Sequence, residues 1–269
     1  MNAESARYIL ATGAHDVERL RLLQEAYGPQ SQALFHRAGL CEGLSIVEIG
    51  CGSGNTACWL AGQVGESGSV VGVDRSAEQI EQARRQAKAR GIRNVSFVVA
   101  DACETQLPAG SFDMAYCRLV LMHLAEPAAG LRAMRELVRS GGRVLCEEMD
   151  LTRWVCEPPS SRIERLFELN VALGELHGGH FRLGTSLPHV FQKVGFPAPQ
   201  VSANFPFTLS GETKRLIGLS FLEFASELVR EGLATQVEVD AIAAEAMRLA
   251  DDASTLFGFP LVVQVWAAR

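Results

Sequence analysis

Three alternating glycines that follow a short apolar run constrain the fold of this chain more than any other feature. Residues 45–49 are rich in β-branched side chains and predict a buried strand, and Gly50, Gly52 and Gly54 follow it. Glycine permits positive φ and a close approach of the backbone to a ligand, and residues 56–63 then predict a helix. The turn is therefore expected to hold a ligand at a helix N-terminus.

The spacing of these glycines bears on the kind of ligand. A dinucleotide-binding turn has the pattern Gly-x-Gly-x-x-Gly, but here the third glycine comes one place early and Asn55 occupies the expected position. The carboxylate of Glu48 also precedes the turn, where it would repel a pyrophosphate and attract an ammonium group. S-adenosylmethionine (SAM) has an ammonium group and no phosphate, so the pattern favours SAM over NAD.

A second apolar run, residues 69–74, predicts a strand that ends in Asp74. An acid at this place can accept hydrogen bonds from both ribose hydroxyls, in SAM as in NAD. Asp74 therefore indicates adenosine binding without selecting the cofactor. Ser76 and Gln79 form a capping box at the start of a helix expected over residues 77–90.

Four motifs now stand in order along the chain: VEIGCGSGN, VVGVDRS, FVVADACETQLPAGSFDMAYCRLVLMHL and SGGRVLCEEMD. With them the chain resembles class I SAM-dependent methyltransferases, and among these it is most similar to small-molecule enzymes related to the ubiquinone and menaquinone C-methyltransferases. The resemblance is close over residues 40–150 and concerns only the architecture elsewhere. It implies an α/β fold with a Rossmann-like, mostly parallel seven-stranded sheet and helices on both faces.

The organisation that follows is one structural domain in three parts. With 269 residues and 48% hydrophobic content, the chain can bury one substantial core. We expect an N-terminal helical lid over residues 1–39, a SAM-binding core over 40–150, and a C-terminal part over 151–269 that completes the sheet and adds helical insertions over the substrate. The further strands are expected at residues 95–100, 112–117, 143–148, 201–209 and 259–267, with a helix over 127–138 that ends at Gly141-Gly142. In the resembling family the last strand lies antiparallel beside the sixth.

The resemblance also implies roles for individual residues. Glu48 would hold the methionine ammonium region through the glycine turn, Asp74 the ribose, and Asp101 with Ala102 the adenine. Without the resemblance, Asp101 could equally cap a helix or a turn. The candidate cofactor-binding residues are Glu48, Gly50, Cys51, Gly52, Gly54, Asn55, Asp74, Arg75, Gln79, Asp101, Ala102 and Arg118.

Residues for the acceptor and for catalysis are less well marked. His123 and His180 are the candidates for a general base, although a histidine at the position of His123 could simply bond a backbone carbonyl. Methyl transfer needs little beyond alignment of the acceptor with the methyl group, so a base is hard to identify from sequence. The substrate candidates are Tyr8, His15, Tyr27, Arg118, His123 and Arg182, and plain packing is the alternative for Tyr8, His15 and Tyr27.

The composition and the residue patterns limit which partners and metals we expect. The net charge of −6 disfavours nucleic acid, and the segment after the fourth strand lacks the Asn/Asp-Pro-Pro-aromatic pattern of enzymes that methylate base amino groups. We expect no metal, since His177 and His180 have no third ligand near them in the sequence. Scattered cysteines and the absence of a long apolar segment predict a cytoplasmic protein with no membrane partner. The apolar stripe over residues 216–228 fits a core helix, a homodimer interface or an apolar substrate chamber.

The predicted function is SAM-dependent methyl transfer to a small-molecule metabolite at oxygen, nitrogen or carbon. Two alternatives stay open. The first is an NAD(P)-dependent oxidoreductase, which the glycine spacing and Glu48 disfavour. The second is a non-catalytic SAM-binding or scaffold protein, because a fold does not guarantee chemistry.

Overall fold

A central seven-stranded sheet organises the computed structural model, which describes residues 14–196 and 198–269. Its strand order is β3-β2-β1-β4-β5-β10-β7, and only β10 runs antiparallel to its neighbours. The strands, in that order, are β3 (Val95–Val99), β2 (Ser69–Asp74), β1 (Ser45–Ile49), β4 (Phe112–Arg118), β5 (Val138–Asp150), β10 (Leu261–Ala268) and β7 (Gln200–Asn204). The predicted Rossmann-like, mostly parallel α/β sheet is confirmed.

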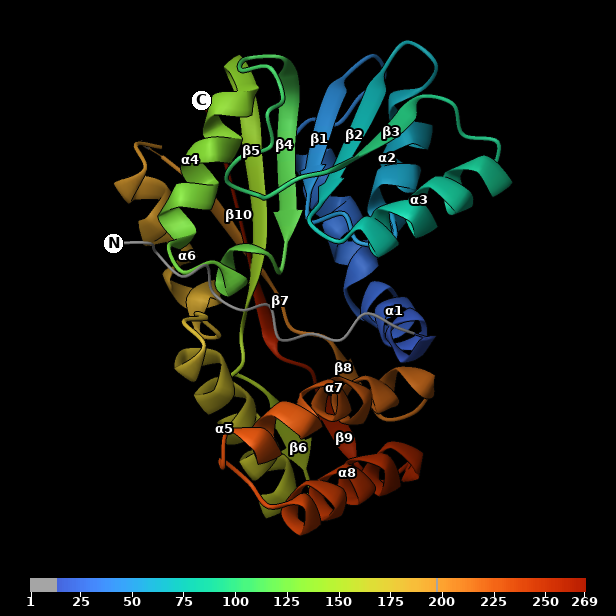
Figure 1. The fold of residues 1–269 in the computed structure, drawn as a ribbon, viewed down its shortest axis with the longest axis vertical. Coiled ribbons are helices and arrows are strands. Elements are labelled where there is room, and N and C mark those ends of the chain that lie inside the picture. The colour runs from blue at the N-terminus through green and yellow to red at the C-terminus, as the bar shows by residue number, and fades with distance from the viewer. Residues whose placement is uncertain (1–13, 197) are drawn as a thin grey trace.

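Helices cover both faces of this sheet, because successive strand residues point to opposite sides. Ile46 and Tyr116 belong to a core shared with one set of helices, whereas Val47 and Cys117 belong to a core shared with the other. The first set consists of α1 (Ala14–Arg37), α2 (Asn55–Val64) and α3 (Ala77–Ala89). The second set consists of α4 (Pro127–Leu137) and α6 (Leu183–Lys193). Figure 1 shows α4 and α6 on the opposite side of the sheet from α2 and α3.

A cap of helices lies beyond the carboxyl ends of the parallel strands, in the lower half of Figure 1. Its helices are α5 (Ser161–Leu176), α7 (Leu216–Arg230) and α8 (Gln236–Asp251), with the short 3-10 helices η1 (Leu121–His123) and η2 (Glu212–Arg215) nearby. A small antiparallel sheet joins it, with β6 (Val155–Glu157), β9 (Leu256–Gly258) and β8 (Phe207–Thr208) in this order. The apolar stripe of α7 faces inward, with Phe221 and Leu228 fully buried.

Several strand boundaries differ from the sequence expectation. The fifth strand begins at Val138, directly after α4, rather than at Arg143. Gly141 and Gly142 therefore lie within the strand. They coincide with a shift in register between the Phe112–Val138 pair and the Met114–Arg143 pair, so the glycines mark a bulge rather than a helix end.

The predicted strand over residues 201–209 is likewise wrong as a single element. It divides into β7 in the large sheet and β8 in the small one, and Pro206 lies between them. Proline has no N–H to donate to a ladder, so pairing stops there, while its carbonyl accepts a hydrogen bond of 2.9 Å from the N–H of Phe259. The final strand starts at Leu261 rather than at residue 259, since the preceding chain forms β9.

Helix α1 is held against the sheet by polar contacts from its second half. The Tyr27 hydroxyl donates to the Pro260 carbonyl at 2.9 Å, and the Gln264 amide donates to the Gln30 carbonyl at 3.2 Å. The same amide donates to the buried Glu147 carboxylate, which also accepts from the Tyr116 hydroxyl at 2.6 Å. The division of the chain into a lid, a core and a C-terminal part stays a prediction, but α1 is firmly joined to the core.

The packing of α6 on β5 gives a first testable prediction. At Gly184 a Cβ atom would lie 2.6 Å from the Glu148 carbonyl oxygen and 2.8 Å from the Met149 carbonyl carbon. Backbone atoms cannot move aside cheaply, so Gly184→Ala should lower the free energy of unfolding by about 1–3 kcal/mol. Chemical denaturation followed by circular dichroism measures the change.

A matched control is Gly62→Ala in the exposed part of α2, where an added Cβ atom would meet no described atom within 4 Å. There the substitution should stabilise the protein by roughly 0.4–1 kcal/mol. Equal effects of the two substitutions would contradict the close packing of α6 on β5.

Candidate functional site

A cavity of about 600 Å³ lies where the carboxyl ends of β1, β2, β4 and β5 meet the cap. Its walls also include the glycine turn, η1, and parts of α1, α5 and α7. Such a crevice is where open α/β sheets bind ligands. All the predicted cofactor residues except Gly54 line it: Glu48, Gly50, Cys51, Gly52, Asn55, Asp74, Arg75, Gln79, Asp101, Ala102 and Arg118.

The glycine turn is fixed from behind and open in front. The N–H groups of Gly50 and Cys51 donate to the Val73 carbonyl at 2.7 and 2.9 Å, which ties the turn to β2. Gly52 has φ +50, and a Cβ there would meet no described atom within 4 Å, so a ligand has room against its backbone. A Cβ at Gly54 would instead press on Ala83 at 2.8 Å and on the Phe97 ring at 3.0 Å. Gly54 thus allows the close packing of the turn on α3 and β3, rather than forming a cavity wall.

The Glu48 side chain is the most unusual feature of the cavity. It is 5% exposed, and its Oε2 atom has no hydrogen-bond partner among the described residues. Burial raises the pKa of the carboxyl to about 8, although the positive charge of Arg118 opposes the rise. A buried carboxylate with an unused acceptor suits a ligand that brings a cationic donor.

Asp74 and Asp101 are oriented by backbone N–H groups. Asp74 accepts from Gly52 through one oxygen and from Ser76 through the other, both at 2.9 Å. Each carboxylate oxygen can accept a further hydrogen bond, so Asp74 can still bind two hydroxyl groups. Asp101 accepts from the Cys103 N–H at 2.8 Å, and is therefore both a turn cap and part of the cavity wall.

Arg118 links the sheet to α1 at the cavity wall. Its guanidinium donates to the Ser31 hydroxyl at 3.0 Å and to the Gln24 side-chain oxygen at 2.7 Å. Both partners lie on α1, and the Tyr27 ring from the same helix also lines the cavity. Of the other candidates in the lid, Tyr8 lies outside the described residues, and so does the side chain of His15.

The two candidate bases are placed differently. His123 lines the cavity, and its ring meets Phe181 edge-on at a centroid distance of 5.3 Å. Burial, with the charges of Arg19 and Arg75, lowers the pKa of His123 to about 4, so the imidazole is neutral near pH 7. A base with so low a pKa accepts a proton only weakly.

His180 and the substrate candidate Arg182 lie outside the cavity that the described residues form. The His180 ring nitrogen lies 3.2 Å from the Ala125 carbonyl oxygen, and its backbone N–H donates to the Met122 carbonyl at 2.7 Å. Arg182 is exposed and pairs with Glu175 at 3.3 Å. His180 thus joins its loop to η1, and Arg182 forms a surface ion pair.

Four buried polar residues of the cavity wall were not predicted from the sequence: Arg19, Ser53, Thr56 and Asn170. Arg19 on α1 is 7% exposed, and Asn170 on α5 is 4% exposed. The Asn170 Oδ1 atom has no hydrogen-bond partner within the described part of the chain. A polar side chain inside the apolar stripe of α5 was the available signal for Asn170, whereas Arg19 follows no pattern in the sequence.

Glu148 has a positioning role at η1. Its carboxylate is fully buried and accepts from the backbone N–H groups of Val120, Leu121 and Met122 at 3.1, 2.7 and 3.3 Å. Burial raises the pKa of Glu148 to about 8. Glu148 therefore holds the turn that carries His123.

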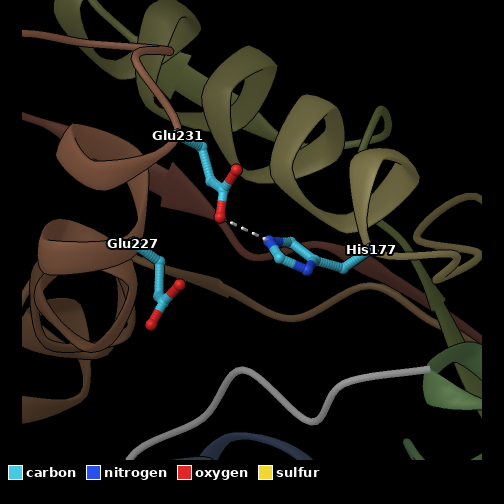
Figure 2. Close-up of side chains that lie close together, drawn as sticks. All are labelled: His177, Glu227 and Glu231. Carbon is cyan, nitrogen blue, oxygen red and sulfur yellow. Dashed lines mark ion pairs between the residues drawn. The ribbon is translucent and has the colours of Figure 1, made fainter. Parts of the chain in front are cut away.

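A second group of polar side chains lies outside the cavity walls and brings His177 together with Glu227 and Glu231 (Figure 2). His177 directly follows α5, whereas Glu227 lies in the last turn of α7 and Glu231 directly follows it, so the sequence near His177 could not have revealed the carboxylates. His180 does not join the group. Arg230 pairs with both carboxylates, which balances much of their charge. No metal role follows from this arrangement.

Comparison with known proteins finds one matching family model and several similar sequences. The sequence model of a family described as methyltransferase domain matches residues 40–183. An aklanonic acid methyltransferase, DauC, from a Streptomyces species is 33% identical over 124 residues, which are 46% of this chain and 56% of that protein. A demethylmenaquinone methyltransferase from Lactococcus lactis is 32% identical over 112 residues, 42% of this chain and 44% of that protein.

The solved structure of the YcgJ protein from Bacillus subtilis has a fold similar to that of this chain. The TM-score is 0.60 at 18% identity, over 89% of this chain and 98% of the other. The matched part of this chain spans about half the length of the curated relatives.

The burial of Glu48 gives a prediction on stability. Because its pKa is near 8 when folded and near 4.5 when unfolded, the unfolded state ionises first as the pH rises. The free energy of unfolding therefore falls, through this group, as the pH rises from about 4.5 to 8. Glu48→Gln removes the penalty, so the variant should gain stability over the parent with rising pH, by roughly 2–4 kcal/mol at pH 8.

Urea unfolding of both proteins without ligand, at pH 5 and pH 8, measures the difference. Glu78→Gln on the exposed side of α3 is the control and should show no such trend. A difference between Glu48→Gln and the parent that stays constant or shrinks toward pH 8 would contradict the burial of a carboxylate at Glu48.

Proposed function

Because this chain belongs to the methyltransferase domain family, we propose that it transfers a methyl group from SAM to a small-molecule metabolite at an oxygen, nitrogen or carbon atom. Two relatives support a small acceptor, since they are named for the methylation of aklanonic acid and of demethylmenaquinone. The observation that carries the proposal is the buried Glu48 carboxylate beside the open backbone of Gly52, in one cavity with Asp74 and Asp101.

The cavity residues fit SAM group by group. Glu48 would accept from the ammonium group of the methionine portion, which supplies the missing partner of its Oε2 atom. Asp74 would accept from the ribose hydroxyls, and Asp101 with Ala102 would border the adenine. Cys51, Asn55, Arg75 and Gln79 would complete the walls around the nucleoside.

When bound, SAM supplies an electrophilic methyl group on a positively charged sulfur. The chain's part is to align an acceptor with that methyl group and to exclude water, and the cap helices α5 and α7 do both by closing the cavity. The side chains of Met122 and His123 on η1 border the space for the acceptor, and Glu148 fixes their turn. No protonation of His123 is needed in this scheme.

The two alternatives are less well supported. A dinucleotide would place a pyrophosphate at the glycine turn, next to the carboxylates of Glu48 and Asp74. A purely SAM-binding role would leave unexplained why the cavity continues into apolar walls from α5 and α7, such as Phe224.

The assembly and the location of the chain stay predictions. None of the described helices is both long and apolar enough to span a bilayer. We predict a cytoplasmic enzyme without nucleic-acid partners, and a homodimer through the C-terminal apolar helices, where Leu222 and Val237 are the large exposed apolar side chains. Light scattering on the purified protein measures its mass in solution.

Cofactor binding tests the proposal directly. SAM, or its demethylated product S-adenosylhomocysteine, should raise the melting temperature by roughly 5 °C at a hundredfold excess over the dissociation constant, because a ligand that binds only the folded state stabilises it. NADH and NADPH should leave it unchanged. Stabilisation by NADH alone would overturn the proposal.

The same assay with Asp74→Ala checks the place of the ribose. The variant should bind S-adenosylhomocysteine at least about tenfold more weakly, because two charge-assisted hydrogen bonds are lost. Glu78→Ala should bind it as the parent does.

A further inference from the structure

An open groove of about 590 Å³ lies between α3 and β3, at the edge of the large sheet that β3 forms (Figure 1). Three cationic side chains line it together with aliphatic ones, and we call it the basic groove: Arg84, Lys88 and Arg93, with Ile92 and Val95. None of the groove residues belongs to the walls of the cavity that the described residues form. The basic groove is therefore a surface separate from the candidate site.

Positive charge is concentrated around the basic groove. Between residues 84 and 93 the sequence has five cationic side chains and no carboxylate, although the net charge of the chain is −6. Lys88, Arg90 and Arg93 are exposed, and within the described part of the chain no carboxylate forms an ion pair with them. The groove is thus a local positive region on an otherwise acidic protein.

Arg84 is held in place at the edge of the sheet. Its guanidinium donates a hydrogen bond of 2.8 Å to the Phe97 carbonyl in β3, and one of its nitrogens lies 3.8 Å from the Glu81 carboxylate. A guanidinium has five N–H donors, so most of them stay available to a partner. A cation placed over an edge strand also discourages the addition of another strand. The basic groove is therefore suited to recognition through partner side chains rather than through backbone pairing.

The open form of the basic groove favours a polypeptide over a small anion. The Arg84 side chain is 52% exposed, and an ion pair between such a group and a single small anion gains little in water. A chain segment with several carboxylates makes several of these contacts at once, and its aliphatic stems can pack on Ile92 and Val95. A nucleic acid or an anionic bilayer extends beyond the groove, where the acidic remainder of the protein would repel it.

We propose that the basic groove binds an acidic segment of a partner protein, with a carboxylate for each of Arg84, Lys88 and Arg93. The interaction is weak and depends on salt, because exposed ion pairs are screened. The partner and a cofactor can be bound at the same time, since the groove and the cavity share no lining residue.

A dye-labelled hexaglutamate peptide tests the proposal, with hexaglutamine as its neutral counterpart. Fluorescence anisotropy with the full chain should give a dissociation constant below about 1 mM for hexaglutamate at roughly 50 mM salt, and at least about fivefold weaker binding at roughly 300 mM salt. Hexaglutamine should not bind. No binding of hexaglutamate, or equal binding of the two peptides, would overturn the proposal.

Charge-neutralised variants locate the binding surface. Replacement of Arg84, Lys88 and Arg93 together by Gln should weaken hexaglutamate binding at least about fivefold. The double variant Lys88→Gln/Arg93→Gln, which keeps the hydrogen bond from Arg84 to β3, should weaken it roughly threefold. Unchanged binding by both variants would contradict the assignment of the groove. Circular dichroism confirms that each variant is folded.

The matched control removes the same number of charges from exposed positions on α4, α5 and α6, away from the groove. It carries three substitutions: Arg132→Gln, Arg162→Gln and Lys193→Gln. The control and the groove variant have the same net charge, so hexaglutamate should bind the control nearly as it binds the parent. An equal loss of affinity in the two would show attraction by overall charge alone and would overturn the proposal.

Two further probes distinguish the class of partner. They are a single-stranded oligothymidylate and vesicles of phosphatidylcholine with phosphatidylserine, and both should bind more weakly than hexaglutamate. Tighter binding of either probe, reduced in the groove variant, would replace the acidic segment by a nucleic acid or a membrane surface. The peptide assay needs no cofactor, so its outcome is independent of the proposed methyl transfer.

Discussion

A carboxyl group held out of water near the end of β1 is the constraint around which this molecule is built. Glu48 sits between the glycine turn and Arg118, and one of its oxygens lacks a hydrogen-bond partner in the described structure. Burial of such a group costs stability unless a cation meets it. The surrounding features suit a ligand of that kind, because the turn is anchored to β2 and Gly52 leaves its backbone accessible. Burial of Glu48 thus costs the unliganded protein stability, which a cationic ligand would restore.

The sheet supplies one side of the cavity, and segments distant in sequence supply the other. Helix α1 is joined to the sheet through Arg118, which bonds Gln24 and Ser31, and through Tyr27, which bonds the segment before β10. The cap helices α5 and α7 close the cavity with apolar side chains. As a result, the carboxylates of Glu48, Asp74 and Asp101 lie on the sheet side of the cavity, whereas apolar side chains such as Phe224 lie on the cap side.

The fold was predictable from sequence to the extent that it depends on local pattern. Strands β1 to β4 and the glycine turn follow from alternating or continuous apolar runs, and the order of motifs predicted their arrangement. The start of β5 and the division of β7 from β8 were not predictable in this way, because a bulge at Gly141 and the pairing of Phe207 with Gly258 depend on tertiary partners. The residues of the candidate site were likewise predictable only in part. Residues next to strand ends were found, whereas Arg19 and Asn170 reach the cavity only through the packing of α1 and α5, and His180 and Arg182 resembled site residues but lie outside it.

Proton release on cofactor binding tests the central role of Glu48 most directly. At pH 6.5 the free protein holds this carboxyl protonated, since its pKa is about 8, and an ammonium group beside it would favour the ionised form. Titration calorimetry with S-adenosylhomocysteine in buffers of different ionisation enthalpy should therefore show the release of about one proton per site, and Glu48→Gln should release none. A binding enthalpy that does not depend on the buffer, or the same proton release from both proteins, would contradict the account.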